Sequence, residues 1–285
     1  MSMASYRDRE CAPTVARAFR RAAHPERVFF GIFQQHNCSL GDEAEFPVEK
    51  RSDKDGRRLD CMDCVANLGQ RLGCPHHPAC AHLWQVRVNR VHWLDSQGPT
   101  YARARSEALY NGETYVMGID SHTNFAEGWD TIMIDMFRRI ANPKAIITAY
   151  PHAYPNSQQE EGGDNAVVQT EPTRMTSICR TRRVRVGKTV SFKHDMNSVK
   201  RPESGPVRVA FLAAGFNFAA GQRVLEVPYD PYTPFLFDGV SLSTRHSHLI
   251  DHSIYQPINQ GANHNCADDF FRSPLTRSAL FARWR

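Results

Sequence analysis

The order of apolar segments in the first 150 residues restricts the fold more than any other feature of this sequence. Short apolar runs, typical of buried strands, alternate with longer stretches that have the apolar spacing of amphipathic helices. Strands that alternate with helices indicate an α/β sheet with parallel strand pairs. The predicted strands cover residues 28–34, 86–93, 115–119 and 145–149, and the predicted helices cover residues 14–23, 101–110 and 129–140.

The pattern changes after residue 151. A polar, glycine-containing loop at 158–165 is followed by short β-like runs at 184–192, 207–211 and 216–219, and the chain then loses its periodicity. We therefore divide the chain into an α/β half, residues 1–150, and a smaller, irregular β-rich half, residues 151–285. A Cys- and His-rich insertion occupies about residues 38–83 of the first half.

Composition excludes several classes of protein. Hydrophobic residues make up 41% of the 285 residues and charged residues 23%, which suits a globular protein rather than a fibrous or disordered one. The net charge of +5 does not indicate nucleic-acid binding, and we interpret the basic run at 180–185 as a solvated face, with a polyanion contact as the alternative. The sequence contains no apolar stretch of about 18 residues, so no membrane span is predicted.

The sharpest local motif is Asp120-Ser121-His122, directly after the apolar run at 115–119. Ligands of open α/β sheets bind at the carboxyl ends of strands. A carboxylate and an imidazole placed there can bind one divalent cation, and this pair suits Mn²⁺ or Zn²⁺ better than Mg²⁺. A capping aspartate next to a surface histidine is the alternative.

A second motif, Gly98-Pro99, opens the helix that precedes this strand. A helix N-terminus favours anions. Arg103 lies one turn into the helix, where it can reach a phosphate or hold a carboxylate. A solvated helix face is the alternative.

The cysteines form a third group. Eight cysteines are too few to cross-link a chain of this size, and without a secretion signal we expect reduced thiols. Four of them have a spacing that offers thiolates to a structural zinc ion. Free thiols and disulfides are the alternatives. The four are Cys61, Cys64, Cys74 and Cys80.

Several segments resemble, in order, the motifs of one enzyme family. They are A-S-Y-R-D at 4–8, G-P-x-x-A-R at 98–103, the metal box Y-x-x-x-I-D-S-H-x-x-F-x-x-G-W-D at 115–130, P-K-A at 143–145, A-A-G-F-x-F-A at 213–219, E-V-P-Y-D-P at 226–231 and P-F-L-F at 234–237. The chain is similar to the polypeptide N-acetylglucosaminyltransferase family, which includes a cytoplasmic hydroxyproline GlcNAc-transferase and is distantly like mucin-type GalNAc-transferases.

The resemblance implies a GT-A-like fold, a Rossmann-related mixed sheet flanked by helices, with a smaller irregular β-rich acceptor lobe. It implies a retaining transferase that uses UDP-GlcNAc, Mn²⁺ or another divalent cation, and a hydroxyl of a protein acceptor. Residues 1–150 would bind the nucleotide sugar, and residues 151–285 the acceptor, with a divergent C-terminal tail. The expected location is the cytoplasm, or the Golgi lumen if the N-terminus is truncated.

The resemblance also assigns site residues. Asp120 and His122 match metal ligands, and His264, seven residues past Pro257, matches the third, with His246, His248 and His252 as alternatives. Arg103 matches the arginine beside the donor, and we take it and Asp238 as the candidate catalytic residues. The box that faces the nucleotide is Ser5, Tyr6, Arg7 and Asp8.

The chain departs from the family pattern in two places. Only Met1, Ser2 and Met3 precede A-S-Y-R-D, where the family has an apolar strand. We therefore expect its two neighbours in the sheet to lack pairing partners. An acidic pair that follows P-F-L-F is also absent, which leaves Asp238 as the nearest carboxylate. The alternatives to an active transferase are an inactive relative that binds a nucleotide sugar or a protein, and a zinc-dependent interaction protein.

Overall fold

A computed structural model describes residues 1–8, 10–36, 64, 68, 74, 76, 78–149 and 212–233. For residues 174–186, 189–200, 207–208 and 253–256 it gives the strand pairing alone. His264, Asp238 and Cys61 lie outside the described residues.

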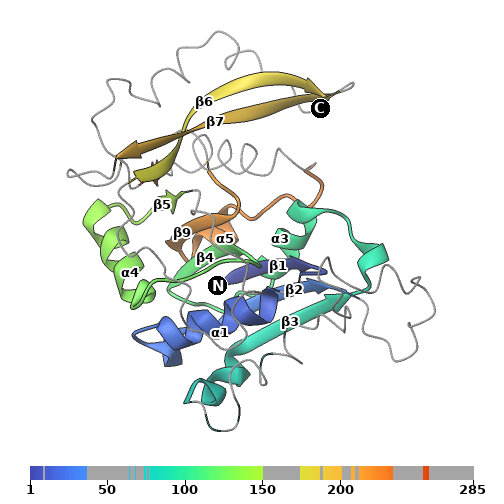
Figure 1. Cartoon of the computed structure of the whole chain (residues 1–285), viewed down its shortest axis with the longest axis vertical. Coiled ribbons are helices and arrows are strands. Elements are labelled where there is room, and N and C mark those ends of the chain that lie inside the picture. Colours follow the sequence, from blue (N-terminus) through green and yellow to red (C-terminus); the bar gives the residue numbers. More distant parts are fainter. Residues whose placement is uncertain are drawn as a thin grey trace.

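The centre of the molecule is an eight-stranded mixed sheet flanked by helices, which confirms the predicted fold class (Figure 1). Strands β1 to β4 are parallel to one another, so their carboxyl ends lie at the same edge. β9 is antiparallel to both of its neighbours, β4 and β5. In spatial order the strands are β3 (Val86–Val91), β2 (Phe30–Gln35), β1 (Ser2–Tyr6), β4 (Tyr115–Asp120), β9 (Phe216–Ala220), β5 (Ala145–Thr148), β10 (Ser253–Gln256) and β8 (Val207–Arg208).

Helices cover both faces of this sheet. Successive residues of a strand point to opposite faces. Met3 packs in the core cluster that includes Phe19 of α1 (Cys11–Arg21), whereas Ser2 hydrogen-bonds Ser106 of α3 (Pro99–Glu107). α1 and α3 therefore lie on opposite faces of β1. α4 (Trp129–Ile140) packs on the α1 side through Phe137, and α5 (Arg223–Glu226) follows β9.

Two side chains at the start of α4 hydrogen-bond to α1 and to the residues that follow it. The indole N–H of Trp129 donates to the carbonyl of Ala18 at 2.9 Å. The Asp130 carboxylate accepts from the backbone N–H groups of Ala23 and His24 at 2.8 and 2.9 Å. These contacts fix the start of α4 and therefore the loop between it and β4.

The central strand β1 corrects one expectation. Ser2, Met3 and the first three residues of the A-S-Y-R-D box form this strand, which pairs with β2 over residues 2–6 and with β4 over residues 2–4. The neighbouring strands therefore do not lack partners. Ser2 and Ser5 are both buried in this strand although they are polar. The Ser2 hydroxyl lies 2.7 Å from the hydroxyl of Ser106, which satisfies it.

Strands from beyond residue 151 complete this sheet. β9 and β10 pair with strands of the first half and β8 pairs with β10, so the two halves share one sheet. The predicted β run at 184–192 instead spans the end of β6 (Arg174–Val186) and the start of β7 (Thr189–Lys200). These two strands pair as an antiparallel hairpin, drawn at the top of Figure 1.

The cysteines differ from the sequence expectation of reduced thiols. Cys11 of α1 is bonded to Cys64, and Cys74 is bonded to Cys80. Both Cys11 and Cys64 are buried in the main core cluster. In this structure the sulfurs of Cys64, Cys74 and Cys80 are divided between two disulfides and are not gathered as thiolates for a zinc ion.

Within the described ranges, no helix is both long and apolar enough to cross a membrane.

Candidate functional site

The motif residues gather at the carboxyl edge of the parallel strands. β1 ends at Tyr6 and β4 at Asp120, and the register pairs Ala4 with Asp120. The chain that follows each strand therefore emerges at the same place. The residues that meet there are Asp8, Arg103, Asp120, Ser121 and His122.

Asp8 is the centre of one hydrogen-bond group. Its Oδ2 accepts from the Ser121 hydroxyl at 2.5 Å and lies 2.9 Å from Nδ1 of His122, while its Oδ1 accepts from the Glu10 backbone N–H at 2.9 Å. An ionised carboxylate only accepts hydrogen bonds, so Nδ1 of His122 carries the proton. In the neutral ring Nε2 is then the nitrogen with a lone pair for a metal ion.

These contacts shift both pKa values. Burial alone would raise the pKa of the Asp8 carboxyl, but hydrogen bonds from His122, Ser121 and Glu10 outweigh it and lower the pKa below 3.8. The hydrogen bond to Asp8 raises the pKa of His122 above 6.5 against the effect of burial, and the negative charges of Asp8, Asp120 and Glu10 raise it further. Asp8 and His122 therefore favour a charged pair in the metal-free protein.

Asp120 and Arg103 form the second group. Nη2 of Arg103 donates to Oδ1 of Asp120 at 2.7 Å. The Asp120 side chain is 40% exposed, whereas that of Arg103 is 12% exposed. A partly exposed ion pair contributes little to stability. Its main effect is geometric: it places one fixed positive charge beside the carboxylate at the end of β4.

The A-S-Y-R-D box leads from the sheet to its edge. Ser5 is buried within β1, whereas Tyr6 is exposed. Arg7 has a positive φ of 48° and places its guanidinium 4.8 Å from the ring centroid of Trp93, which follows β3. Aromatic and cationic groups thus line the edge next to Asp8. Ser5 itself presents no exposed side chain there.

Three residues that the sequence did not assign to the site hold this edge in place. Thr14 of α1 donates its hydroxyl to the Ser121 carbonyl at 2.8 Å and accepts from the Thr123 N–H at 3.1 Å, which fixes the loop that carries His122. Gly215 packs against the Asp120 carboxylate, and Thr148 fixes the turn that contains Gly215. The A-A-G-F-x-F-A motif contains Gly215, but the sequence does not indicate the role of any of the three, since each acts on a partner far away in the chain.

Two of the three predicted metal ligands come together at this edge. Asp120 and His122 flank Ser121, and the His122 side chain is 63% exposed. The part of the chain that the structure describes holds no group of three or more ligand-type side chains arranged around one point. Asp120 and His122 still fit a manganese or zinc ion chemically, because they offer one carboxylate and one imidazole nitrogen from a single loop.

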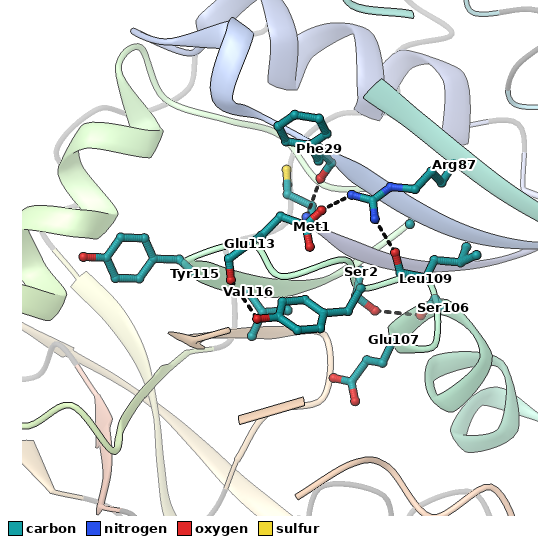
Figure 2. Close-up of a pocket in the computed structure, with 12 residues that line it drawn as sticks. Met1, Ser2, Phe29, Arg87, Ser106, Glu107, Leu109, Glu113, Tyr115 and Val116 are labelled. Carbon is teal, nitrogen blue, oxygen red and sulfur yellow. Dashed lines mark hydrogen bonds and ion pairs between the residues drawn. The ribbon is translucent and has the colours of Figure 1, made fainter. Parts of the chain in front are cut away.

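A hollow lies at the opposite, amino edge of the same strands (Figure 2). The Met1 amine donates to the Phe29 carbonyl there at 2.5 Å, and burial, with the charge of Arg87, lowers the pKa of this amine to about 5. Arg87 forms an ion pair with Glu113 beside it. This hollow is separated from Asp120 by the length of β4, so it does not belong to the site at the carboxyl edge.

Comparison with known protein families gives a match over residues 1–265 to the family described as Glycosyltransferase (GlcNAc). The matched range includes every residue discussed at the carboxyl edge and extends past His264. A search of curated proteins finds no match.

Proposed function

The chain belongs to the GlcNAc glycosyltransferase family, and on that premise we propose that it transfers GlcNAc from UDP-GlcNAc to a hydroxyl group of a protein acceptor. The observation that carries this proposal is the meeting of Asp120, His122, Arg103 and Asp8 at one edge of the sheet. That edge is where open α/β sheets bind their ligands. The two disulfides of the structure are typical of proteins in oxidising compartments, so the proposal does not extend to the cytoplasm.

We assign each side chain a role from its contacts. Asp120 and Nε2 of His122 are the groups that would hold a divalent cation, with His264 as the proposed third ligand. When bound, that cation supplies charge to neutralise a diphosphate. Asp8 orients the imidazole of His122 through Nδ1. Tyr6 and Arg7 extend along the same edge, where they can hold the nucleotide.

Arg103 supplies a permanent positive charge beside Asp120. Hydrogen bonds between a guanidinium and phosphate oxygens are charge-assisted and strong. A charge fixed in advance is most effective where negative charge develops, which here is the departing diphosphate. Arg103 therefore acts on the leaving group and not on the acceptor.

The proposed reaction needs no strong base from the protein. The bond between C1 of the sugar and the diphosphate oxygen breaks, and a bond forms between C1 and the acceptor oxygen on the same face, with retention. The acceptor proton passes to an oxygen of the departing diphosphate. Asp238 stays a candidate on the acceptor side.

The test is release of UDP from UDP-GlcNAc, measured with Mn²⁺ or with EDTA, and with UDP-GalNAc in parallel. The wild type is compared with Asp120→Ala and with Asp135→Ala, which removes an exposed carboxylate on α4. We expect Mn²⁺-dependent release by the wild type and Asp135→Ala, lost by Asp120→Ala. Binding of UDP-GlcNAc without release would instead support the inactive-relative alternative. Equal release by Asp120→Ala would refute the assigned site.

A further inference from the structure

We propose that Gly215 and Thr148 are positioning residues that set the orientation of the Asp120 carboxylate at the donor site. The inference rests on the proposed function, because it assigns to these residues a role in holding a proposed metal ligand. It concerns a contact between β4 and the turn that precedes β9, two segments that are far apart in the chain.

Gly215 is in direct contact with Asp120. The Gly215 carbonyl accepts a hydrogen bond from the Asp120 N–H at 3.2 Å. A Cβ at position 215 would collide with Oδ2 of Asp120 and lie 3.0 Å from its Cγ. Gly215 is absent from the residues with positive φ, so the position requires glycine for space and not for backbone conformation. Any side chain here must displace the carboxylate.

The carboxylate is therefore held from two sides. Oδ1 is 2.7 Å from Nη2 of Arg103, and Oδ2 faces Gly215. Rotation that relieves a collision at Oδ2 also moves Oδ1 away from Arg103. The orientation of Asp120 thus depends on how closely the Gly215 turn approaches β4.

Thr148 sets that approach. Its side chain is fully buried at the end of β5. The hydroxyl donates to the Phe216 carbonyl at 2.8 Å and accepts from the Ala213 N–H at 2.8 Å. The turn also closes on itself, since the Phe216 N–H donates to the Ala213 carbonyl at 3.2 Å. Both ends of the turn are thereby fixed to one side chain, with Gly215 between them.

The first experiment is a mutant cycle on thermal stability in the absence of metal and donor. Gly215→Ala should lower the melting temperature of the wild type by a small but measurable amount, because the new methyl group displaces the Asp120 carboxylate from Arg103. In the Asp120→Ala background the same change should have little effect, since the colliding atoms are gone. An equal loss of melting temperature in both backgrounds would overturn the proposal.

The second experiment is binding of UDP with Mn²⁺. Gly215→Ala should weaken it by about tenfold or more, the usual effect of disturbing the support of a metal ligand. The control is Gly112→Ala, which strains a φ of 88° with no atom near the added Cβ, and should lose stability without losing affinity. Wild-type affinity in Gly215→Ala would refute the role of Gly215.

Thr148 is tested with two substitutions. Thr148→Ser keeps the hydroxyl and should bind UDP with Mn²⁺ as the wild type does, whereas Thr148→Val keeps the shape and should bind it more weakly. If Thr148→Val does not fold, the mutant cycle of Gly215→Ala with Asp120→Ala decides whether the proposal holds. If Asp120→Ala leaves binding unchanged, the proposed function fails, whereas normal binding by Gly215→Ala alone refutes only the positioning role.

Discussion

The carboxylate of Asp8 lies 2.9 Å from Nδ1 of His122, although the two residues are 114 positions apart in the chain. β1 and β4 bring them together, because these strands are parallel neighbours that end at the same edge. The contact leaves Nε2 as the ring nitrogen that would bind the proposed metal. It links a motif expected to face the nucleotide with a motif expected to bind the cation.

Asp8→Asn tests this relationship. The amide keeps the size of the side chain but loses the charge that orients His122. We expect affinity for Mn²⁺ with UDP to fall by about 10- to 100-fold, as for other residues that orient a metal-bound histidine. Calorimetric titration measures it. Glu127→Gln, an exposed carboxylate in the same loop, is the matched control and should bind normally. Equal affinities in all three proteins would contradict the role of Asp8.

The titration of His122 in the metal-free protein follows from the same contact. NMR should give a pKa above 6.5 in the wild type, because Asp8 stabilises the imidazolium, and a lower pKa in Asp8→Asn. The imidazolium contribution to stability is complete below pH 6.5 and is lost as pH rises through the raised folded pKa. The Asp8 contribution is present above pH 3.8 and is lost as pH falls through its lowered pKa.

The stability difference between wild type and Asp8→Asn should therefore be largest between about pH 3.8 and 6.5. Melting temperatures across this range measure it. A His122 pKa that is identical in the two proteins would show that the two side chains do not interact in solution.

Arg103→Met should impair the donor site. Loss of a charge-assisted hydrogen bond of about 1.5–3 kcal/mol corresponds to roughly a 10- to 100-fold fall in kcat/KM for UDP-GlcNAc. Arg105→Met is the matched control, since Arg105 lies on the same helix and is exposed. Steady-state kinetics of both variants measure the effect. Equal losses in the two would point to general damage to α3.

The ion pair between Arg223 and Glu107 fastens α3 to α5. The two side chains are 1% and 2% exposed, with Nη2 and Oε1 2.5 Å apart. Arg223→Met should cost about 3–5 kcal/mol in the free energy of unfolding, because Glu107 is left buried without its partner. Glu107→Met with Arg223→Met should be more stable than either single variant. Denaturant titration of the wild type, the two single variants and the double variant measures these free energies of unfolding. Losses of the single variants that simply add in the double variant would contradict the pairing.

The two disulfides should differ in their effect on stability. Cys11 and Cys64 are 53 positions apart, whereas Cys74 and Cys80 are 6 apart. Loop-closure entropy gives about 4 kcal/mol for the first and about 2 kcal/mol for the second. Replacing both cysteines of each pair by alanine and measuring unfolding compares them. Mass spectrometry after alkylation of the unreduced protein gives the direct answer, and alkylated Cys11 would contradict the bond.

The sequence predicted the elements whose signal is local. The helix expected at 129–140 is α4 (Trp129–Ile140) without any shift, because its apolar periodicity is continuous and Gly128 precedes it with a positive φ. β4 follows equally from an uninterrupted apolar run that ends at Asp120. The place of Asp120 and His122 at the carboxyl edge follows from that strand alone.

The features that the sequence did not predict depend on distant partners. The sequence did not predict β1 because Ser2 and Ser5 are polar, and the hydroxyl partner of the buried Ser2, Ser106, lies on a helix far away in the chain. The bond between Cys11 and Cys64 cannot be read from spacing, since many pairings are compatible with one set of cysteines. The contact of Gly215 with Asp120 likewise requires the antiparallel pairing of β9 with β4.

Calorimetric titration of UDP, with Mn²⁺ and with EDTA, tests most directly the claim that the carboxyl edge of β1 and β4 is the donor site. We predict that UDP binds the wild type only when Mn²⁺ is present, and that Asp120→Ala loses this binding while Asp135→Ala keeps it. Mn²⁺-dependent binding of UDP that is equally tight in the wild type and Asp120→Ala would contradict it.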